Sequence, residues 1–135
     1  MRKNKAAAEI WLNKANDHFT FAKAGWEESD IVSDTCVLCQ LAGEKALKAL
    51  LELENIDVEK TPSLKIHRLA DIIQECKQYY PQVEKFEDDC DRLTVYYFDR
   101  YPSEIPLNLT EEDAAFALAV AEEILNFVEE IISST

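Results

Sequence analysis

Apolar residues recur every three or four positions along most of this chain, which is the spacing of an amphipathic helix. A threonine N-cap and three acidic residues open the last of these periodic segments. No stretch alternates with the period of two that marks a strand, and the sequence holds only two glycines. The pattern therefore predicts an all-α, up-and-down bundle of four long helices plus one shorter helix. The predicted helices cover residues 5–28, 32–54, 65–79, 82–98 and about 111–132.

Two details of this pattern predict how the helices pack. Gly43 lies in the middle of the second helix, where glycine lowers helix stability, so we expect another helix to approach closely there. The apolar arc of the last helix is wider than one packing face needs. We expect this helix either to be central or to contact a second subunit, and Val128 is the position where a charge would test such a contact.

The composition limits the class of protein. A length of 135 residues suits one domain, which we place over 1–135 with a core of about 8–132. The formal net charge is −13, so general binding to nucleic acid is disfavoured, although a local basic pocket is compatible with that charge. No apolar run reaches the roughly 20 residues that span a bilayer, and we expect a soluble cytoplasmic protein with no membrane contact.

The cysteines do not form a metal-binding pattern. Cys36 and Cys39 make a C-x-x-C within a predicted helix, without the second pair of ligands that a zinc site needs. We expect all four cysteines to be structural, and we expect no metal and no cofactor.

Glu44 and Lys48 are four residues apart, which predicts a solvated ion pair on the helix surface.

The candidate functional stretch is "YYFDRYPSEIP", from Tyr96 to Pro106. Its rings either pack at a helix end, or form a surface that stacks on a base or a partner while the arginine binds a phosphate or carboxylate. His67, at the predicted start of the third helix, is either structural or part of an anion site. The candidate binding residues are Arg100, Tyr97, Tyr101, Asp99 and His67.

Several motifs, in this order, resemble one known family. They are "WLNKANDHFTFAKAG" (Trp11–Gly25), "QLAGEKALKALLELENI" (Gln40–Ile56), "IHRLADII" (Ile66–Ile73) and "DRLTVYYFDRYP" (Asp91–Pro102), followed by a Thr-Glu-Glu helix start. Together they resemble the HEPN domain, whose name stands for higher eukaryotes and prokaryotes nucleotide-binding. The resemblance covers roughly residues 8–132.

The resemblance implies a helical bundle that is usually a homodimer and is often encoded beside a minimal nucleotidyltransferase, as in toxin–antitoxin pairs. Active members of the family are metal-independent ribonucleases that use an Arg followed four to six residues later by a His. Neither Arg92 nor Arg100 is followed by a His at that distance. Without a histidine at that distance to transfer protons, Arg100 can bind a phosphate but lacks the proton-transfer group of the motif, which disfavours nuclease activity.

Three functions therefore stand as hypotheses. The first is a HEPN-like interaction or nucleotide-binding module, a homodimer that works with a nucleotidyltransferase-type partner in a toxin–antitoxin or stress system. The second is a divergent ribonuclease that uses Arg100 with a tyrosine or His67. The third is a dimerising bundle without a ligand. The dimer face is expected on the last helix or in the cleft beside Arg100.

Overall fold

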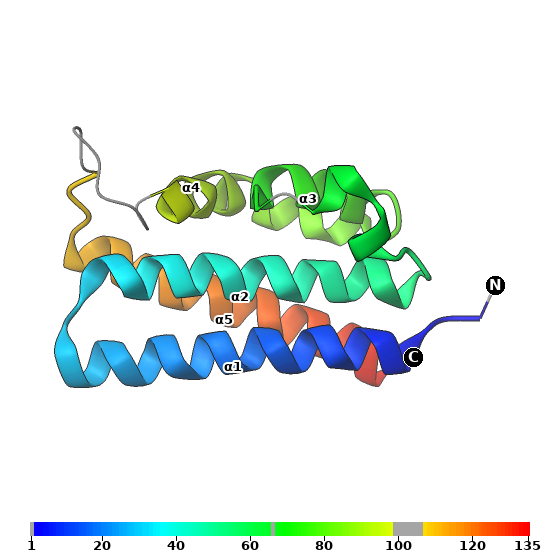
Figure 1. Cartoon of the computed structure of the whole chain (residues 1–135), viewed down its shortest axis with the longest axis horizontal. Helices are drawn as coiled ribbons and strands as arrows, with labels where there is room; N and C mark the ends of the chain where they lie inside the picture. The colour runs from blue at the N-terminus through cyan, green and yellow to red at the C-terminus, as the bar shows by residue number, and fades with distance from the viewer. Residues whose placement is uncertain (1, 66, 99–106) are drawn as a thin grey trace.

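In the part of the chain that the structure describes, five α-helices pack side by side, with three short 3-10 turns in the connections (Figure 1). The computed structural model describes residues 2–65, 67–98 and 107–135. No strand occurs in these ranges, and the all-α bundle is confirmed. The α-helices are α1 (Lys5–Ser29), α2 (Val32–Leu53), α3 (Leu69–Lys77), α4 (Glu87–Tyr97) and α5 (Glu111–Ser133), and the 3-10 turns are η1 (Val58–Lys60), η2 (Pro62–Leu64) and η3 (Pro81–Phe86).

Helix α2 is the centre of the bundle. In Figure 1 it lies between α1 and α5 on one side and α3 and α4 on the other, and it contacts all four. Sixteen of its 22 residues are buried. Gly43 allows α3 and α5 to approach α2 closely. A Cβ built there would lie 3.2 Å from Cδ2 of Leu69 and 3.7 Å from Cδ1 of Ile124. The predicted close approach is therefore confirmed, and it involves both α3 and α5.

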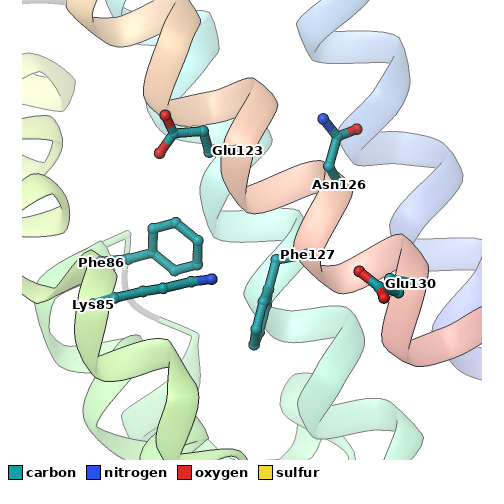
Figure 2. A pocket seen from close by; sticks show the side chains of 6 residues that line it. All are labelled: Lys85, Phe86, Glu123, Asn126, Phe127 and Glu130. Carbon is teal, nitrogen blue, oxygen red and sulfur yellow. The ribbon is translucent and has the colours of Figure 1, made fainter.

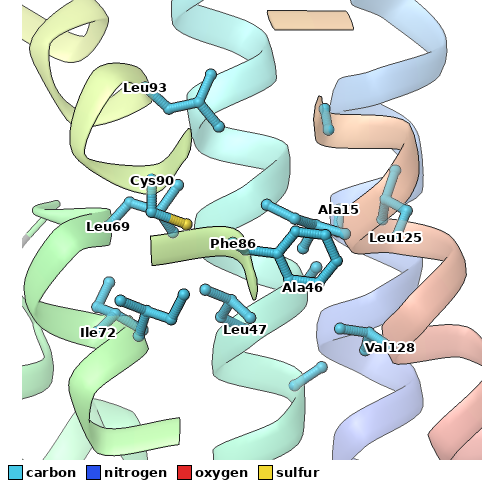
Figure 3. Packing of buried hydrophobic residues seen from close by; sticks show 14 of the residues in the cluster. Ala15, Ala46, Leu47, Leu69, Ile72, Phe86, Cys90, Leu93, Leu125 and Val128 are labelled. Carbon is cyan, nitrogen blue, oxygen red and sulfur yellow. The ribbon is translucent and has the colours of Figure 1, made fainter. Parts of the chain in front are cut away.

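One hydrophobic core joins all the helices. Figure 3 shows side chains from α1, α2, α3, α4, α5 and η3 meeting around Ala46 and Leu47 of α2. Helix α5 packs against both α1 and α2, and its Phe127 meets Phe86 of η3 edge to face, with ring centroids 5.5 Å apart. These neighbours account for the wide apolar arc of α5. Val128 is fully buried in this core, so the prediction that it can report on a dimer face was wrong.

Two predicted helix starts were also wrong. The third helix begins at Leu69 rather than residue 65, because Pro62 starts the 3-10 turn η2 and extended backbone at Arg68 precedes α3. The fourth begins as the 3-10 turn η3 at Pro81 and becomes α-helical only at Glu87. His67 consequently lies outside α3, directly before its N-cap residue Arg68.

Within the described ranges, none of the helices is long and apolar enough to cross a membrane.

Candidate functional site

A buried carboxylate in α2 binds two lysines of the same helix and a histidine from the segment before α3. The side chain of Glu44 is fully buried in the middle of α2. Its Oε2 lies 3.0 Å from Nζ of Lys48 and 3.3 Å from Nζ of Lys45, and Nδ1 of His67 lies 3.1 Å from both carboxylate oxygens. We call these four residues, Glu44, Lys45, Lys48 and His67, the Glu44 cluster. It joins a core helix to a segment 23 residues later in the chain.

The charges within the Glu44 cluster favour an additional anion. Burial by itself raises the pKa of the Glu44 carboxyl, but Lys48, Lys45 and His67 together outweigh burial and lower that pKa. One ionised carboxylate therefore faces two ammonium groups and an imidazole, so the cluster keeps an excess of positive charge in a chain of net charge −13. Lys48 is almost fully buried, whereas the side chains of Lys45 and His67 are 19% and 44% exposed. Lys45 is therefore the ammonium group that can present this excess to a ligand, and the partly exposed imidazole of His67 can add a hydrogen bond.

His67 is held on three sides. A carboxylate only accepts hydrogen bonds, so Nδ1 of His67 donates to Glu44 and any lone pair of the ring lies on Nε2. One face of the imidazole stacks on Tyr97 with ring centroids 4.8 Å apart, and the amide of Gln40 donates to the His67 carbonyl at 2.9 Å. No described residue hydrogen-bonds Nε2. This nitrogen is therefore oriented and available to bind or transfer a proton.

Helix α1 covers the other side of the cluster with Trp11. The ammonium groups of Lys45 and Lys48 lie 5.6 Å and 5.8 Å from the centroid of its ring. His18 lies about two turns after Trp11 on α1 and is affected by the same charges. Its pKa is lowered mainly by burial, and Lys14 and Lys45 lower it further. The part of the cluster around Lys45 therefore places positive charge next to an aromatic ring.

The structure brings together two of the five predicted binding residues. Tyr97, at the end of α4, and His67 are in contact with each other. The other three, Asp99, Arg100 and Tyr101, lie outside the described residues. Tyr97 precedes Arg100 by three positions, so the chain enters that stretch directly from the His67 contact.

The pairing of Glu44 with Lys48 was correctly anticipated, but its environment was not. The prediction of a solvated surface pair was wrong, because both side chains are buried beneath α1 and the segment before α3. Helix periodicity does contain a signal for this. Glu44 lies three residues before Leu47 and Lys48 three residues before Leu51, so each shares a helix face with a fully buried leucine.

Arg92 has a structural role at the junction of α4 and α5. It donates to Tyr96 at 2.8 Å and to Asp113 at 3.0 Å, and it lies 3.8 Å from the ring centroid of Phe116. Asp113 also accepts from the backbone N–H of Thr110 at 2.8 Å, which completes the capping box of α5. Tyr96 and Thr110 flank residues 99–106 in the sequence, so these bonds tie together the two elements on either side of that stretch.

A groove of about 500 Å³ lies away from the Glu44 cluster, between η3 and α5 (Figure 2). Its Lys85 lies 5.1 Å from the ring centroid of Phe86 and 4.9 Å from that of Phe127. Glu123 and Glu130 line the same groove, so its acids outnumber its cation. An anion is therefore disfavoured here, in contrast to the Glu44 cluster.

The cysteines agree with the structural interpretation. All four are buried and none forms a disulfide, and burial raises the pKa of Cys39 to about 12. A thiol with so high a pKa stays protonated at neutral pH and is therefore a poor nucleophile. The described residues include no group of three or more His, Cys, Asp and Glu side chains placed to bind a metal ion.

The comparisons with known proteins fit this geometry. A family model described as the HEPN domain matches residues 8–131. No curated protein and no solved structure shows significant similarity to the chain. The matched residues contain all of α2, α3 and α4, and with them the whole Glu44 cluster and its aromatic neighbours. The chain therefore belongs to the HEPN family.

Proposed function

We propose that this chain is a nucleotide-binding interaction module whose Glu44 cluster binds the phosphate of its ligand. Membership of the HEPN family supports a nucleotide-binding or ribonuclease-like module. The observation that carries the proposal is the excess of cations around one buried carboxylate, with Lys45 and His67 partly exposed beside Trp11 and Tyr97. Charge-assisted hydrogen bonds from such groups are the usual means of holding a phosphate.

The wider setting belongs to the same proposal. The chain acts as one domain over residues 1–135, in the cytoplasm, as a homodimer paired with a nucleotidyltransferase-type protein in a toxin–antitoxin or stress system. Arg100, Asp99 and Tyr101 contribute to the anion or partner site next to Tyr97. Family membership and the position of these residues after Tyr97 support this part. Light scattering tests the homodimer, and co-expression with the protein encoded by the adjacent gene, followed by pull-down, tests the partner.

Isothermal titration with nucleoside mono- and triphosphates tests the binding site. The wild type is expected to bind one or more of them, and Lys45→Gln to weaken binding about tenfold, because one charge-assisted hydrogen bond is lost. Glu44 keeps Lys48 and His67 in this variant, so the fold is expected to survive. Lys23→Gln, an exposed lysine on α1, is the matched control and should bind like the wild type. If no nucleotide binds, or if both variants behave alike, the proposed site is refuted.

One observation favours a second candidate function, that of a divergent ribonuclease. Glu44 orients His67 through Nδ1 and leaves Nε2 available, which is the arrangement of a general base. In this role Nε2 would take the proton of an RNA 2′-hydroxyl as the 2′-oxygen attacks the phosphorus; the bond from phosphorus to the 5′-oxygen breaks, a water molecule protonates that leaving oxygen, and Arg100 binds the phosphate. Incubation with RNA compares the wild type with His67→Gln and Arg100→Ala. Cleavage that His67→Gln abolishes supports the ribonuclease, and equal lack of cleavage in all three proteins eliminates it.

A further inference from the structure

A groove on the α1 side of the Glu44 cluster has the size and chemistry of a small-ligand site. Its volume is about 530 Å³, within the range of about 300–1,000 Å³ that small-molecule sites occupy. It shares one cation with the cluster and adds a second from α1. An aromatic ring, an amide, two cations and two acids line it: Trp11, Asn13, Lys14, Lys45, Asp17 and Glu59.

We propose that this groove, which we call the Trp11 groove, binds a nucleoside monophosphate, with the base against Trp11 and the phosphate between Lys14 and Lys45. This inference rests on the proposed function, because it locates the nucleotide that the function requires. Lys45 is the residue that the groove and the Glu44 cluster have in common.

The contacts of the groove residues prepare the site before a ligand arrives. Glu44 holds the ammonium group of Lys45 at 3.3 Å, and that group lies 5.6 Å from the centroid of the Trp11 ring. Lys48, on the next turn of α2, lies over the same ring. Ring and cation therefore have fixed positions, which lowers the entropy lost on binding. An aromatic ring of this kind can stack on any base, because every base has a π-face.

The charges of the groove select the number of phosphates. Lys14 and Lys45 match the charge of one phosphate group, while Asp17 and Glu59 can accept hydrogen bonds from ribose hydroxyls. Both acids repel additional phosphates, so a triphosphate is disfavoured relative to a monophosphate. The lowered pKa of His18, to which Lys14 and Lys45 contribute after burial, agrees with a positive potential at this end of the groove.

Trp11 itself provides the assay. The chain has two tryptophans, so Trp26→Phe leaves Trp11 as the only indole reporter. In this background, fluorescence titrations use AMP, ribose 5-phosphate and ATP, at constant ionic strength and without metal. We expect AMP to quench Trp11, ribose 5-phosphate to bind at least fivefold more weakly, and ATP to bind more weakly than AMP. Lys14→Gln should weaken AMP about tenfold, whereas Lys23→Gln should not change it.

The possible outcomes separate this inference from the proposed function. If AMP binds by calorimetry but neither quenches Trp11 nor responds to Lys14→Gln, the Trp11 groove is overturned and the proposed function stands. If ribose 5-phosphate or ATP binds as tightly as AMP, the assignment to a nucleoside monophosphate is overturned. If no nucleotide binds at all, the inference and the binding part of the proposed function both fail. Each variant is first compared with its parent by circular dichroism, so that loss of fold is not counted as loss of affinity.

Discussion

Replacing Glu44 by glutamine removes the negative charge at the centre of the cluster while keeping the size of the side chain. Lys48 is then left with its ammonium group buried and its carboxylate partner gone, since its side chain is only 5% exposed. Removing one partner of a buried ion pair costs about 3–5 kcal/mol. Glutamine retains an acceptor oxygen for Lys48, and Lys45 and His67 can turn towards water, so we expect the low end, about 3 kcal/mol. For a chain of this length, that corresponds to a fall in Tm of about 10 °C.

Urea unfolding at neutral pH measures this loss, and a double-mutant cycle with Lys48→Met tests its cause. Because Lys48→Met removes the buried cation, the double variant should recover about 2 kcal/mol relative to the sum of the two single variants. Glu9→Gln, at an exposed position on α1, is the control and should change stability by less than about 0.5 kcal/mol. A loss below about 1 kcal/mol for Glu44→Gln, or additive effects in the cycle, would refute the description of the cluster as a buried, coupled unit.

The same variant has a defined pH dependence. The pKa of Glu44 is lower in the folded state than its ordinary value of 4.5, because Lys48, Lys45 and His67 outweigh the effect of burial. Its contribution to stability is therefore complete above pH 4.5 and is lost as the pH falls through the lower folded pKa. The difference in unfolding free energy between wild type and Glu44→Gln should be constant near neutral pH and should shrink below pH 4.5. A difference that grows on acidification would contradict the assigned pKa shift.

Three further predictions concern the fold. Gly43→Ala should change stability by less than about 1 kcal/mol in thermal unfolding, because the gain in helix propensity opposes a 3.2 Å contact with Leu69. Gly43→Val should destabilise the fold by about 2 kcal/mol, and an unchanged stability of this variant would contradict the close packing of α2. Thr110→Ala removes the N-cap of α5 and should cost about 1 kcal/mol in urea unfolding, while an unchanged midpoint would mean that the capping box is not formed in solution. The four buried thiols should react with a thiol reagent such as DTNB only after unfolding, and rapid reaction of the native protein at pH 8 would show that the core opens.

The sequence predicted the parts of the fold that depend on local pattern. Periodicity located the helices, and Gly43 indicated the close approach of neighbouring helices, because both signals act within a few residues. The starts of α3 and α4 were misplaced where short 3-10 turns replaced α-helix, since the competition between these two backbone geometries is decided by tertiary packing. Val128 was placed on a possible dimer face because periodicity shows that a residue is apolar but not which neighbour covers it.

The candidate site was only partly predictable for the same physical reason. Tyr97 was chosen as part of an aromatic cluster and His67 for its place at a predicted helix start, and their contact joins residues 30 positions apart in the sequence. The pairing of Glu44 with Lys48 follows from their spacing, but its burial depends on α1 and on the segment before α3. Nothing in the spacing of Trp11 indicates that it lies beside Lys45, because the two residues belong to different helices.

The most direct test of the proposed phosphate site is an NMR titration of the ¹⁵N-labelled wild type with AMP, which reports on amides throughout the chain at once. The account predicts saturable shift changes at the backbone amides of Lys45 and His67 and at the indole N–H of Trp11. It also predicts little change at Lys85 and Phe127, which line the acidic groove of Figure 2. Changes confined to that groove, or no changes at millimolar AMP, would contradict the claim that the Glu44 cluster is the phosphate-binding site of this protein.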